Sequence, residues 1–322
     1  MMIHAPLPTP YWLGIDIGGT KIAVIVLNQN NQVVGQALAP TETTTPAHLV
    51  KGIIAAANCA LTQAHTDITQ VAGVGIGIPG QVNTHTGEVA LAVNLNLSNY
   101  PLGHELSQQW GKPVTLENDV RAAAVGAYFH LTQPSALSPH SSLAYLSIGT
   151  GIAAGVVLNG QLHRGANGMA GEVGHITVDP QGERCACGQT GCLETIVAGP
   201  ALVRQAERVG LRVAHAGEVY AAAHQGHSGA QTIVQRVSAA LCQAIQWLVL
   251  TYDVEKVILG GGVTQAGATF LDPVLQTVAQ RRASSPLLQM LLPDDKIALL
   301  PAGFNAGAWG AIALAQQCLT RE

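Results

Sequence analysis

Residues 11–27, YWLGIDIGGTKIAVIVL, decide the fold of this chain. Two apolar runs, residues 11–17 and 22–27, flank a Gly-Gly-Thr-Lys turn, which predicts a strand, a turn and a second strand. Residues 143–158, LAYLSIGTGIAAGVVL, repeat the pattern roughly 131 residues further along the chain. Two such hairpins predict a duplicated α/β fold with one phosphate-binding turn in each half.

This duplicated arrangement is typical of the actin/hexokinase-like (ribonuclease H-like) ATPases, whose two α/β domains enclose a ligand cleft. A chain of 322 residues is long enough for two domains of ordinary size. We therefore expect two α/β domains, each built around one of the two hairpins.

An acidic residue interrupts the first apolar run. A carboxylate inside a buried strand costs free energy unless it is paired or bound to a metal. Because Asp16 precedes Gly18-Gly19-Thr20-Lys21, it is a candidate to hold a hydrated Mg²⁺ while backbone N–H groups of the turn face phosphates. The alternative is an ordinary hairpin that tolerates an aspartate. The turn is not a Walker loop, since the Gly-x-x-x-x-Gly-Lys spacing is absent.

Two further glycine turns are candidates for contacts with a nucleotide. The first belongs to the second hairpin, and the other closes the apolar strand predicted over residues 256–259, where a wall of glycine lets adenine and ribose lie against backbone. The candidate residues are Gly149, Thr150 and Gly151, and Gly260, Gly261 and Gly262.

Polar residues also follow two other predicted strands. The strand over residues 113–116 ends in Glu117-Asn118-Asp119 before an Ala-rich helix predicted over residues 120–130. An acid at this place in an α/β fold favours chemistry, which makes Asp119 a candidate general base; the alternative is that Asn118 or Asp119 only caps the helix. After the strand at residues 71–78, an apolar loop carries Asn94 and Asn96, for which a turn role is the alternative to ligand binding.

Residues 171–194, GEVGHITVDPQGERCACGQTGCLE, hold half of the six cysteines of the chain. Cys185 and Cys187 are too close in sequence to be comfortable disulfide partners. Three thiolates and the imidazole of His175 instead make a closed tetrahedral set for a structural zinc ion, with Cys192 brought back by the intervening glycines. The alternative is a loop of three reduced cysteines without a ligand.

The same stretch resembles the motif of the ROK family, bacterial sugar kinases and some transcriptional repressors. It shows the order Glu-x-Gly-His, a spacer, and Cys-x-Cys-Gly-x-x-Gly-Cys-x-Glu, and the other motifs occur in the order of the family over essentially the whole chain. One departure is the replacement of two usual glycines after Gly151 by Ala153 and Ala154.

This resemblance implies an enzyme that phosphorylates a hexose at its C6 hydroxyl with ATP, with Asp119 as the catalytic base. Glucose is the favoured substrate, while kinases for N-acetylmannosamine, N-acetylglucosamine and fructose share these motifs. The implied cofactors are ATP, Mg²⁺ and a structural Zn²⁺. The implied contacts to the sugar are Asn94, Asn118, Asp119, Glu172, His175 and Glu194.

The resemblance also sets the expected domain boundaries and assembly. We expect a smaller N-terminal domain of residues 1–118 that the closing helix, about 305–322, rejoins, and a larger domain of residues 119–304 with the zinc loop. The low charge, the apolar excess and the habit of the family favour a homodimer or homotetramer.

Composition argues against several other classes of function. The charged fraction is 11%, against ~25% in ordinary soluble domains, the net charge is −4, and no run of Lys or Arg suggests a nucleic-acid surface. Residues 1–10 do not read as a signal peptide, and no apolar run approaches a membrane span of ~20 residues. We therefore expect a cytoplasmic protein with reduced thiols.

Two rival functions remain. A sugar-responsive repressor would need a DNA-binding segment before the first strand, where the sequence has about ten residues. A non-catalytic sugar-binding protein is the other rival; retention of Asp16 and Asp119 argues against it, whereas Ala153 and Ala154 leave it open.

Overall fold

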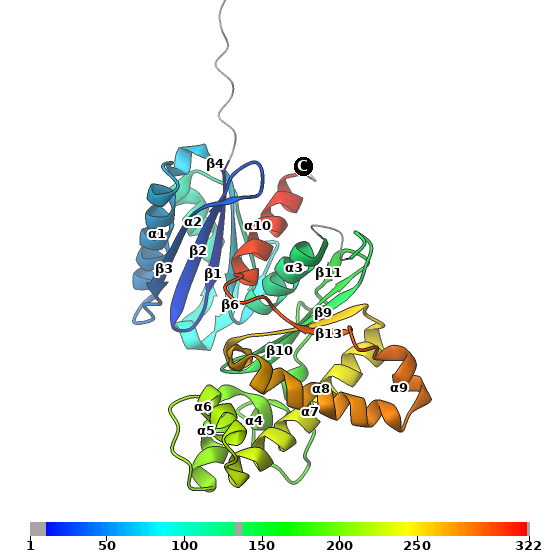
Figure 1. Cartoon of the computed structure of the whole chain (residues 1–322). Helices are drawn as coiled ribbons and strands as arrows, with labels where there is room; N and C mark the ends of the chain where they lie inside the picture. The colour runs from blue at the N-terminus through cyan, green and yellow to red at the C-terminus, as the bar shows by residue number, and fades with distance from the viewer. Residues whose placement is uncertain (1–10, 133–136, 321–322) are drawn as a thin grey trace, which may run out of the picture. The chain divides into compact units, whose positions relative to one another are not determined.

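The computed structural model describes residues 11–132 and 137–320, which form two compact units. Unit 1 comprises Met1–Leu137, Arg164–Met169 and Asn305–Glu322, and unit 2 comprises Ser138–His163 and Ala170–Phe304. Figure 1 shows the elements of both units along the chain. The expectation that residues 1–10 carry no targeting signal lies outside the described residues.

A five-stranded mixed sheet forms the centre of unit 1, in the order β3-β2-β1-β4-β8. β1 is antiparallel to β2 and parallel to β4, and β4 is parallel to β8. The carboxyl ends of β1, β4 and β8 therefore meet at one edge of the sheet. Its strands are β1 (Tyr11–Ile17), β2 (Lys21–Leu27), β3 (Val33–Pro40), β4 (Val71–Ile78) and β8 (Val114–Asn118).

Helices and a small sheet complete unit 1. As the sequence predicts, the first helix starts after the N-cap Thr45, whose side chain accepts a hydrogen bond from the backbone N–H of His48. The small antiparallel sheet was not predicted. These elements are α1 (Pro46–Gln63), β5 (Gln81–Asn83), β6 (Glu88–Ala92), β7 (Leu97–Tyr100), α2 (Leu102–Trp110), α3 (Asp119–Thr132) and α10 (Ala306–Leu319).

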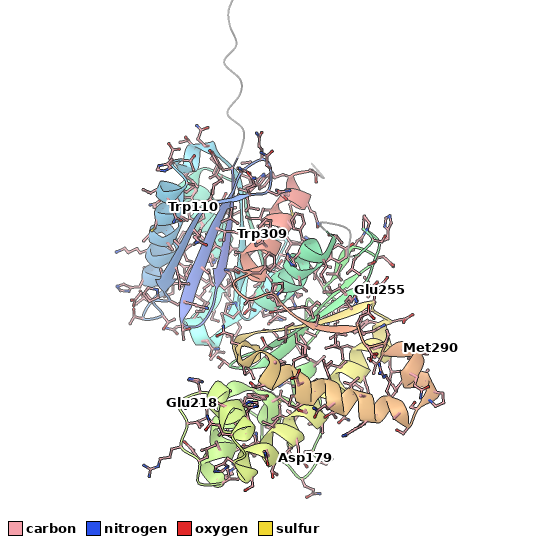
Figure 2. All side chains as sticks on the ribbon, in the orientation of Figure 1. Trp110, Asp179, Glu218, Glu255, Met290 and Trp309 are labelled. Atoms are coloured by element: carbon pink, nitrogen blue, oxygen red, sulfur yellow. The ribbon has the colours of Figure 1, made fainter. Side chains whose placement is uncertain are left out.

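Helix α10 packs closely against the sheet and against α3. A Cβ on Gly75 of β4 would stand 1.9 Å from the carbonyl oxygen of Ala311, and one on Gly310 would stand 1.7 Å from that of Ala122. Trp309 of α10, labelled in Figure 2, stacks on Phe129 of α3. The ring centroids are 5.6 Å apart. This packing places α3 in unit 1, so the boundary lies beyond the expected position between residues 118 and 119.

Unit 2 repeats the sheet of unit 1. Its order is β11-β10-β9-β12-β13, and β9 is likewise antiparallel to its hairpin partner and parallel to β12. The turn of the second hairpin is one residue shorter than that of the first. Ile17 pairs with Ile22, five residues on, whereas Ile148 pairs with Ile152, four residues on. The predicted duplication is confirmed. The strands are β9 (Leu143–Ile148), β10 (Ile152–Leu158), β11 (Gln161–His163), β12 (Lys256–Gly260) and β13 (Ile297–Leu299).

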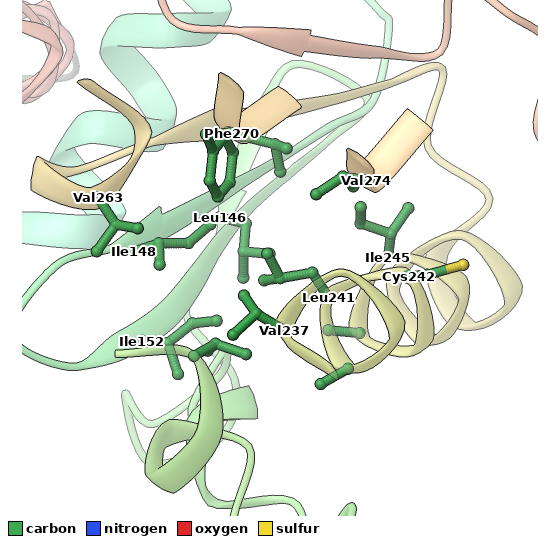
Figure 3. Close-up of a cluster of buried hydrophobic side chains, with 14 of the residues drawn as sticks. Leu146, Ile148, Ile152, Val237, Leu241, Cys242, Ile245, Val263, Phe270 and Val274 are labelled. Atoms are coloured by element: carbon green, nitrogen blue, oxygen red, sulfur yellow. The ribbon is translucent and has the colours of Figure 1, made fainter. Parts of the chain in front are cut away.

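Helices cover this second sheet, and a long one supplies much of its core. Figure 3 shows Val237, Leu241 and Ile245 of α7 beside Leu146 of β9, and Phe270 lies in the same cluster. The sequence predicts helices over residues 199–210, 217–225 and 231–252, where α5, α6 and α7 lie, but none where α8 and α9 lie. The helices are α4 (Glu194–Val197), α5 (Gly199–Arg208), α6 (Ala216–His224), α7 (Ser228–Tyr252), α8 (Ala268–Ala283) and α9 (Pro286–Leu291).

In the described part of the chain, α7 is the one helix long and apolar enough to cross a membrane. Most of its apolar stretch is buried inside unit 2, and its buried residues include Leu241 and Ile245, each 0% exposed. The helix therefore has the character of a core helix.

Candidate functional site

Two aspartates meet at the carboxyl edge of the sheet in unit 1. Asp16 near the end of β1 is paired with Gly77 of β4, and Gly77 is paired with Glu117 of β8, after which the chain reaches Asp119. A Cβ on Gly77 would stand 3.5 Å from Asp119 Cα and 3.8 Å from Asp16 Oδ1. Because Gly77 has no side chain, the two acids come near enough for the charge of Asp119 to act on Asp16. The sequence indicated each acid separately and did not predict that they meet.

The surroundings of Asp16 disfavour its negative charge. Burial, and after it the charge of Asp119, raise the pKa of its carboxyl to about 7, against the opposing effect of Lys21. A divalent cation bound near the two carboxylates would offset both burial and repulsion. The residues therefore fit the Mg²⁺ that was expected beside this turn.

Asn118 and Asp119 both cap α3, so the capping alternative describes part of their role. The Oδ1 atom of Asn118 accepts hydrogen bonds from the backbone N–H groups of Val120 and Arg121, both at 3.1 Å. Asp119 Oδ1 accepts from Val120 N at 2.9 Å and from Asn118 Nδ2 at 3.0 Å. These bonds fix the direction of the Asp119 side chain, which a general base also requires.

Glu117 is a buried acid that the sequence analysis did not assign. Its carboxylate is 1% exposed and accepts hydrogen bonds from Arg121 Nε at 2.8 Å, Arg164 Nε at 2.7 Å and Asn118 N at 2.9 Å. Arg121 Nη1 also donates to the carbonyl oxygen of Gly168 at 2.6 Å. The contacts of Glu117 with Arg164 and of Arg121 with Gly168 therefore tie residues 164–169 to the strand end that precedes Asp119. An acid at an inward strand position was the signal available in the sequence.

The first phosphate turn is ordered by backbone bonds. Gly18 N donates to Lys21 O at 2.8 Å, and the hydroxyl of Thr41 donates to Gly18 O at 2.8 Å. Gly19 and Thr20 are exposed, as binding to phosphates requires. The turn is therefore held at its base and open at its tip.

The two asparagines of the apolar loop have different roles. Asn96 adopts a left-handed conformation, with φ of 55°, at the end of a short 3-10 helix, which is the turn role weighed for it. Asn94 is exposed and lies beside the first phosphate turn, since a Cβ on Gly19 would stand 3.9 Å from Asn94 Cβ. Asn94 is therefore the one that stays a candidate for binding.

The two glycine turns predicted for a nucleotide lie together in unit 2. A Cβ on Gly149 would stand 3.9 Å from Gly262 N, and one on Gly261 would stand 2.4 Å from the carbonyl oxygen of Ile148. Gly261 has φ of 95°, which favours glycine. The structure thus brings the two turns to one place, although more than 100 residues separate them in the sequence.

Ala154, one of the two alanines that depart from the family pattern, belongs to the core of unit 2. Ala154 is 2% exposed and packs with Ile152 in the hydrophobic cluster. Ala153 points to the other face of β10, because side chains alternate along a strand. The Ala154 methyl therefore fills core space and does not project from the turn itself.

His175, Cys185, Cys187 and Cys192 converge in unit 2, with one ligand atom of each within 4.8 Å of the others. Nδ1 of His175 lies 3.7 Å from Cys185 Sγ, and Cys187 Sγ lies 3.6 Å from Cys192 Sγ. A tetrahedral zinc ion with Zn–S bonds of about 2.3 Å requires separations between ligands of roughly 3.8 Å. The four residues therefore fit the predicted ion, and Nε2 of His175 stays available for another contact.

The loop around this set is anchored to the rest of unit 2. A Cβ on Gly191, whose φ is 72°, would stand 1.5 Å from the carbonyl oxygen of Asp179. The side chain of Asp179 (Figure 2) forms an ion pair with Arg236 Nη2 at 2.8 Å. The close backbone approach explains why the loop needs glycine before its last cysteine.

The three polar residues that flank the zinc ligands lie differently. Glu172 is exposed, and His175 is half-buried. Glu194 is also half-buried, and its Oε2 accepts a hydrogen bond from the backbone N–H of Ile152 at 3.2 Å. Glu194 was expected to contact a sugar, and here it contacts the end of the second phosphate turn, which was not predicted.

Comparison with known proteins agrees with these motifs. A model of the ROK family matches residues 12–318. A glucokinase from Halalkalibacterium halodurans is 33% identical over 282 residues, which cover 83% of this chain and 84% of that protein. An N-acetylmannosamine kinase from Vibrio vulnificus is 33% identical over 252 residues, covering 78% and 82%.

A solved structure agrees over nearly the same extent. The crystal structure of a ROK family glucokinase from Streptomyces griseus, in complex with glucose and AMPPNP, has a TM-score of 0.78 and 30% sequence identity to this chain. It covers 95% of this chain and 99% of its own. With the duplicated sheets, the paired aspartates and the His-Cys₃ set in place, the chain belongs to the ROK family.

Proposed function

We propose that this protein transfers the γ-phosphoryl group of ATP to the C6 hydroxyl of a hexose, with glucose as the preferred substrate. The observation that carries the proposal is the pair Asp16 and Asp119, which meet over Gly77 beside an open glycine turn. Phosphoryl transfer asks a protein mainly for positioning and for stabilisation of charge, and this arrangement offers both.

Each residue has a role in the proposed reaction. Asp119 accepts the proton of the C6 hydroxyl as its oxygen attacks the γ-phosphorus atom. Asp16 would hold Mg²⁺, which would supply positive charge opposite the phosphates. The two phosphate turns, the Gly260–Gly262 turn and Lys21 bind ATP. The hydroxyls of the sugar are held by Asn94, Asn118, Glu172, His175 and Glu194.

The zinc ion is proposed as structural. The set of His175, Cys185, Cys187 and Cys192 uses four protein ligands, which leaves no open position for chemistry. Its contribution is to fix the imidazole of His175, so that the other ring nitrogen can donate to a sugar hydroxyl. Metal analysis of the purified protein, with one zinc per chain expected, is the direct measurement.

A panel of hexoses with ATP and Mg²⁺ tests the function. We expect glucose to give the highest kcat/KM among glucose, N-acetylmannosamine, N-acetylglucosamine and fructose. Asp119→Asn is the matched variant: it is expected to fold and to bind the sugar but to lose ~10²–10⁴-fold in kcat, as is usual when a general base is removed. Near-normal kcat in this variant would reject the role of Asp119.

The same panel decides between glucose and the second candidate. N-acetylmannosamine has a specific claim, because a kinase of that sugar is as similar in sequence to this chain as the glucokinase is. A higher kcat/KM for N-acetylmannosamine would assign the protein to that sugar. Glucose binding without ATP consumption for any hexose would instead identify a non-catalytic sugar sensor.

We also infer a cytoplasmic homo-oligomer. All six cysteines lie in the described part of the chain and none is bonded to another, which suits a reducing compartment. The oligomer is inferred from the low charged fraction of 11% and the apolar excess of the sequence. Light scattering that gives a monomer mass at micromolar concentration would contradict the inference.

A further inference from the structure

The backbone of Ile152 is held from two sides. This residue begins β10, directly after the turn Gly149–Gly151, and its side chain is 4% exposed in the core of unit 2 (Figure 3). Its N–H donates to Glu194 Oε2 at 3.2 Å. On the carbonyl side, a Cβ on Gly174 would stand 2.2 Å from Ile152 O. The start of β10 is therefore contacted by Gly174 and Glu194, which lie near the two ends of the zinc loop, residues 171–194.

Two backbone hydrogen bonds add to these contacts around the second phosphate turn. Ala154 N donates to Gly171 O at 2.7 Å, and Gly199 N donates to Gly149 O at 2.8 Å. A Cβ on Gly151 would stand 2.5 Å from Glu194 Oε2, so the turn leaves just enough room for this carboxylate. The second phosphate turn thus has contacts at its first residue, at its last residue and just after it, to Gly199, Glu194 and Gly171.

The zinc ligands join the two segments that hold the turn. Gly174 directly precedes His175, and Glu194 follows Cys192 by two residues. Backbone bonds already link the two segments, such as Leu193 N to Ile176 O at 2.9 Å. A metal bound by both His175 and Cys192 would fix their separation and with it the positions of Gly174 and Glu194.

We propose that the zinc loop is a clamp on the second phosphate turn, with Glu194 as a positioning residue that acts on the turn through the N–H of Ile152. The turn keeps its nucleotide-binding conformation only while zinc holds the two segments and Glu194 accepts this hydrogen bond. This role is separate from any contact that Glu194 makes with a sugar. It rests on the proposed function for the statement that the turn binds the phosphates of ATP.

Hydrogen exchange measured on the protein without nucleotide or sugar tests the clamp directly. We expect removal of zinc by a chelator, the variant Cys187→Ser and the variant Glu194→Ala each to speed exchange of the amides of residues 149–155 by roughly tenfold or more, since a hydrogen bond to a charged group is lost or loosened. Glu194→Gln keeps an acceptor oxygen and should restore part of the protection. Unchanged exchange in the zinc-free protein or in Glu194→Ala would overturn the proposal.

Glu183 supplies the matched control. It lies in the same loop, but its carboxylate forms ion pairs with Arg204 and Arg208 and not with the turn. Glu183→Ala therefore removes a carboxylate from the loop while zinc content and exchange at residues 149–155 stay as in the wild type. Faster exchange at 149–155 in this control would mean a general loosening of the loop and would also overturn the proposal.

Binding of AMPPNP without sugar gives a second readout. We expect Glu194→Ala to retain one zinc per chain but to bind AMPPNP roughly tenfold more weakly, with Glu194→Gln in between. Equal affinity in Glu194→Ala and wild type would contradict the clamp. Failure of the zinc-loaded wild type to bind AMPPNP would instead contradict the proposed function, whereas the exchange experiment, which uses no ligand, would still decide the clamp.

Discussion

The carboxylate of Asp16 lies directly against Gly307, the second residue of α10. A Cβ on Gly307 would stand 2.4 Å from Asp16 Cγ and 2.6 Å from both carboxylate oxygens. The contact joins the end of β1 to a helix almost 300 residues away in the sequence. It also places the carboxylate at the amino-terminal end of α10, where the partial positive charge of the helix favours an anion.

Gly307→Ala should displace Asp16 and so lower kcat by at least roughly tenfold, because the added methyl group occupies the place of the carboxylate. Overpacking of this kind typically costs ~1–3 kcal/mol of stability. Gly52→Ala is the control, since this helical glycine has only an ordinary contact of 3.7 Å to Ile22 Cδ1. Kinetics and urea unfolding check both variants. Wild-type kcat in Gly307→Ala would show that Asp16 needs no fixed position.

Asp16→Asn should stabilise the protein without nucleotide and metal at high pH. Burial and the charge of Asp119 raise the pKa of Asp16 to about 7 in the folded state, above its unfolded value of 3.8. The folded state therefore holds a proton that the unfolded state has lost, and stability falls as pH rises from about 4 to 7. The variant removes this loss, which for a shift of this size is on the order of 4 kcal/mol at pH 8.

Urea unfolding in EDTA at pH 4, 6 and 8 measures this effect. Asp67→Asn is the control of opposite sign, because hydrogen bonds from Thr69 hold the pKa of that carboxyl below its usual range. Asp67→Asn should slightly destabilise the protein at pH 8. The effect should shrink as pH falls toward the pKa of the Asp67 carboxyl. A pH dependence for Asp16→Asn identical to that of the wild type would refute the argument.

Glu117→Ala should destabilise the protein by ~3–5 kcal/mol, because it leaves the charge of the Arg121 guanidinium, which is 4% exposed, without a carboxylate to balance it. Arg164→Ala should cost at most ~1 kcal/mol, since Arg164 is 41% exposed and Glu117 keeps Arg121. Chemical denaturation of the two variants tests this order. Equal losses would show that Glu117 contributes by holding residues 164–169 and not through its buried pair with Arg121.

Glu172→Ala should raise KM for glucose by one to two orders of magnitude, because hydroxyls that donate to a charged acceptor lose ~1.5–3 kcal/mol with it. The variant should also discriminate less between glucose and 2-deoxyglucose than the wild type does, if Glu172 reads the anomeric side of the sugar. Asp119→Asn should instead lower kcat for both sugars alike. Unchanged discrimination in Glu172→Ala would leave the acid with a role only in shaping the zinc loop.

Several elements of the fold were predictable because local chemistry determines them. The hairpin around Gly18 and Gly19 follows from two apolar runs and a glycine turn, and the start of α1 follows from the Thr45 cap. The zinc set was also readable, since its four ligands lie within one short stretch of sequence. The elements that were missed carry weaker local signals: β5, β6, β7 and α9 are short, and α8 has Pro273 inside it.

The sequence by itself determined which residue types are present, how they are spaced, and that the hairpin occurs twice. Only the tertiary structure decided which of them meet: Asp16 with Gly307, Asp119 with Asp16 across Gly77, and Ile152 with Glu194. These contacts depend on how closely two backbones approach. That distance is set by packing between elements far apart in the chain. In the sequence, a glycine that ends a turn looks the same as a glycine that makes room for a carboxylate.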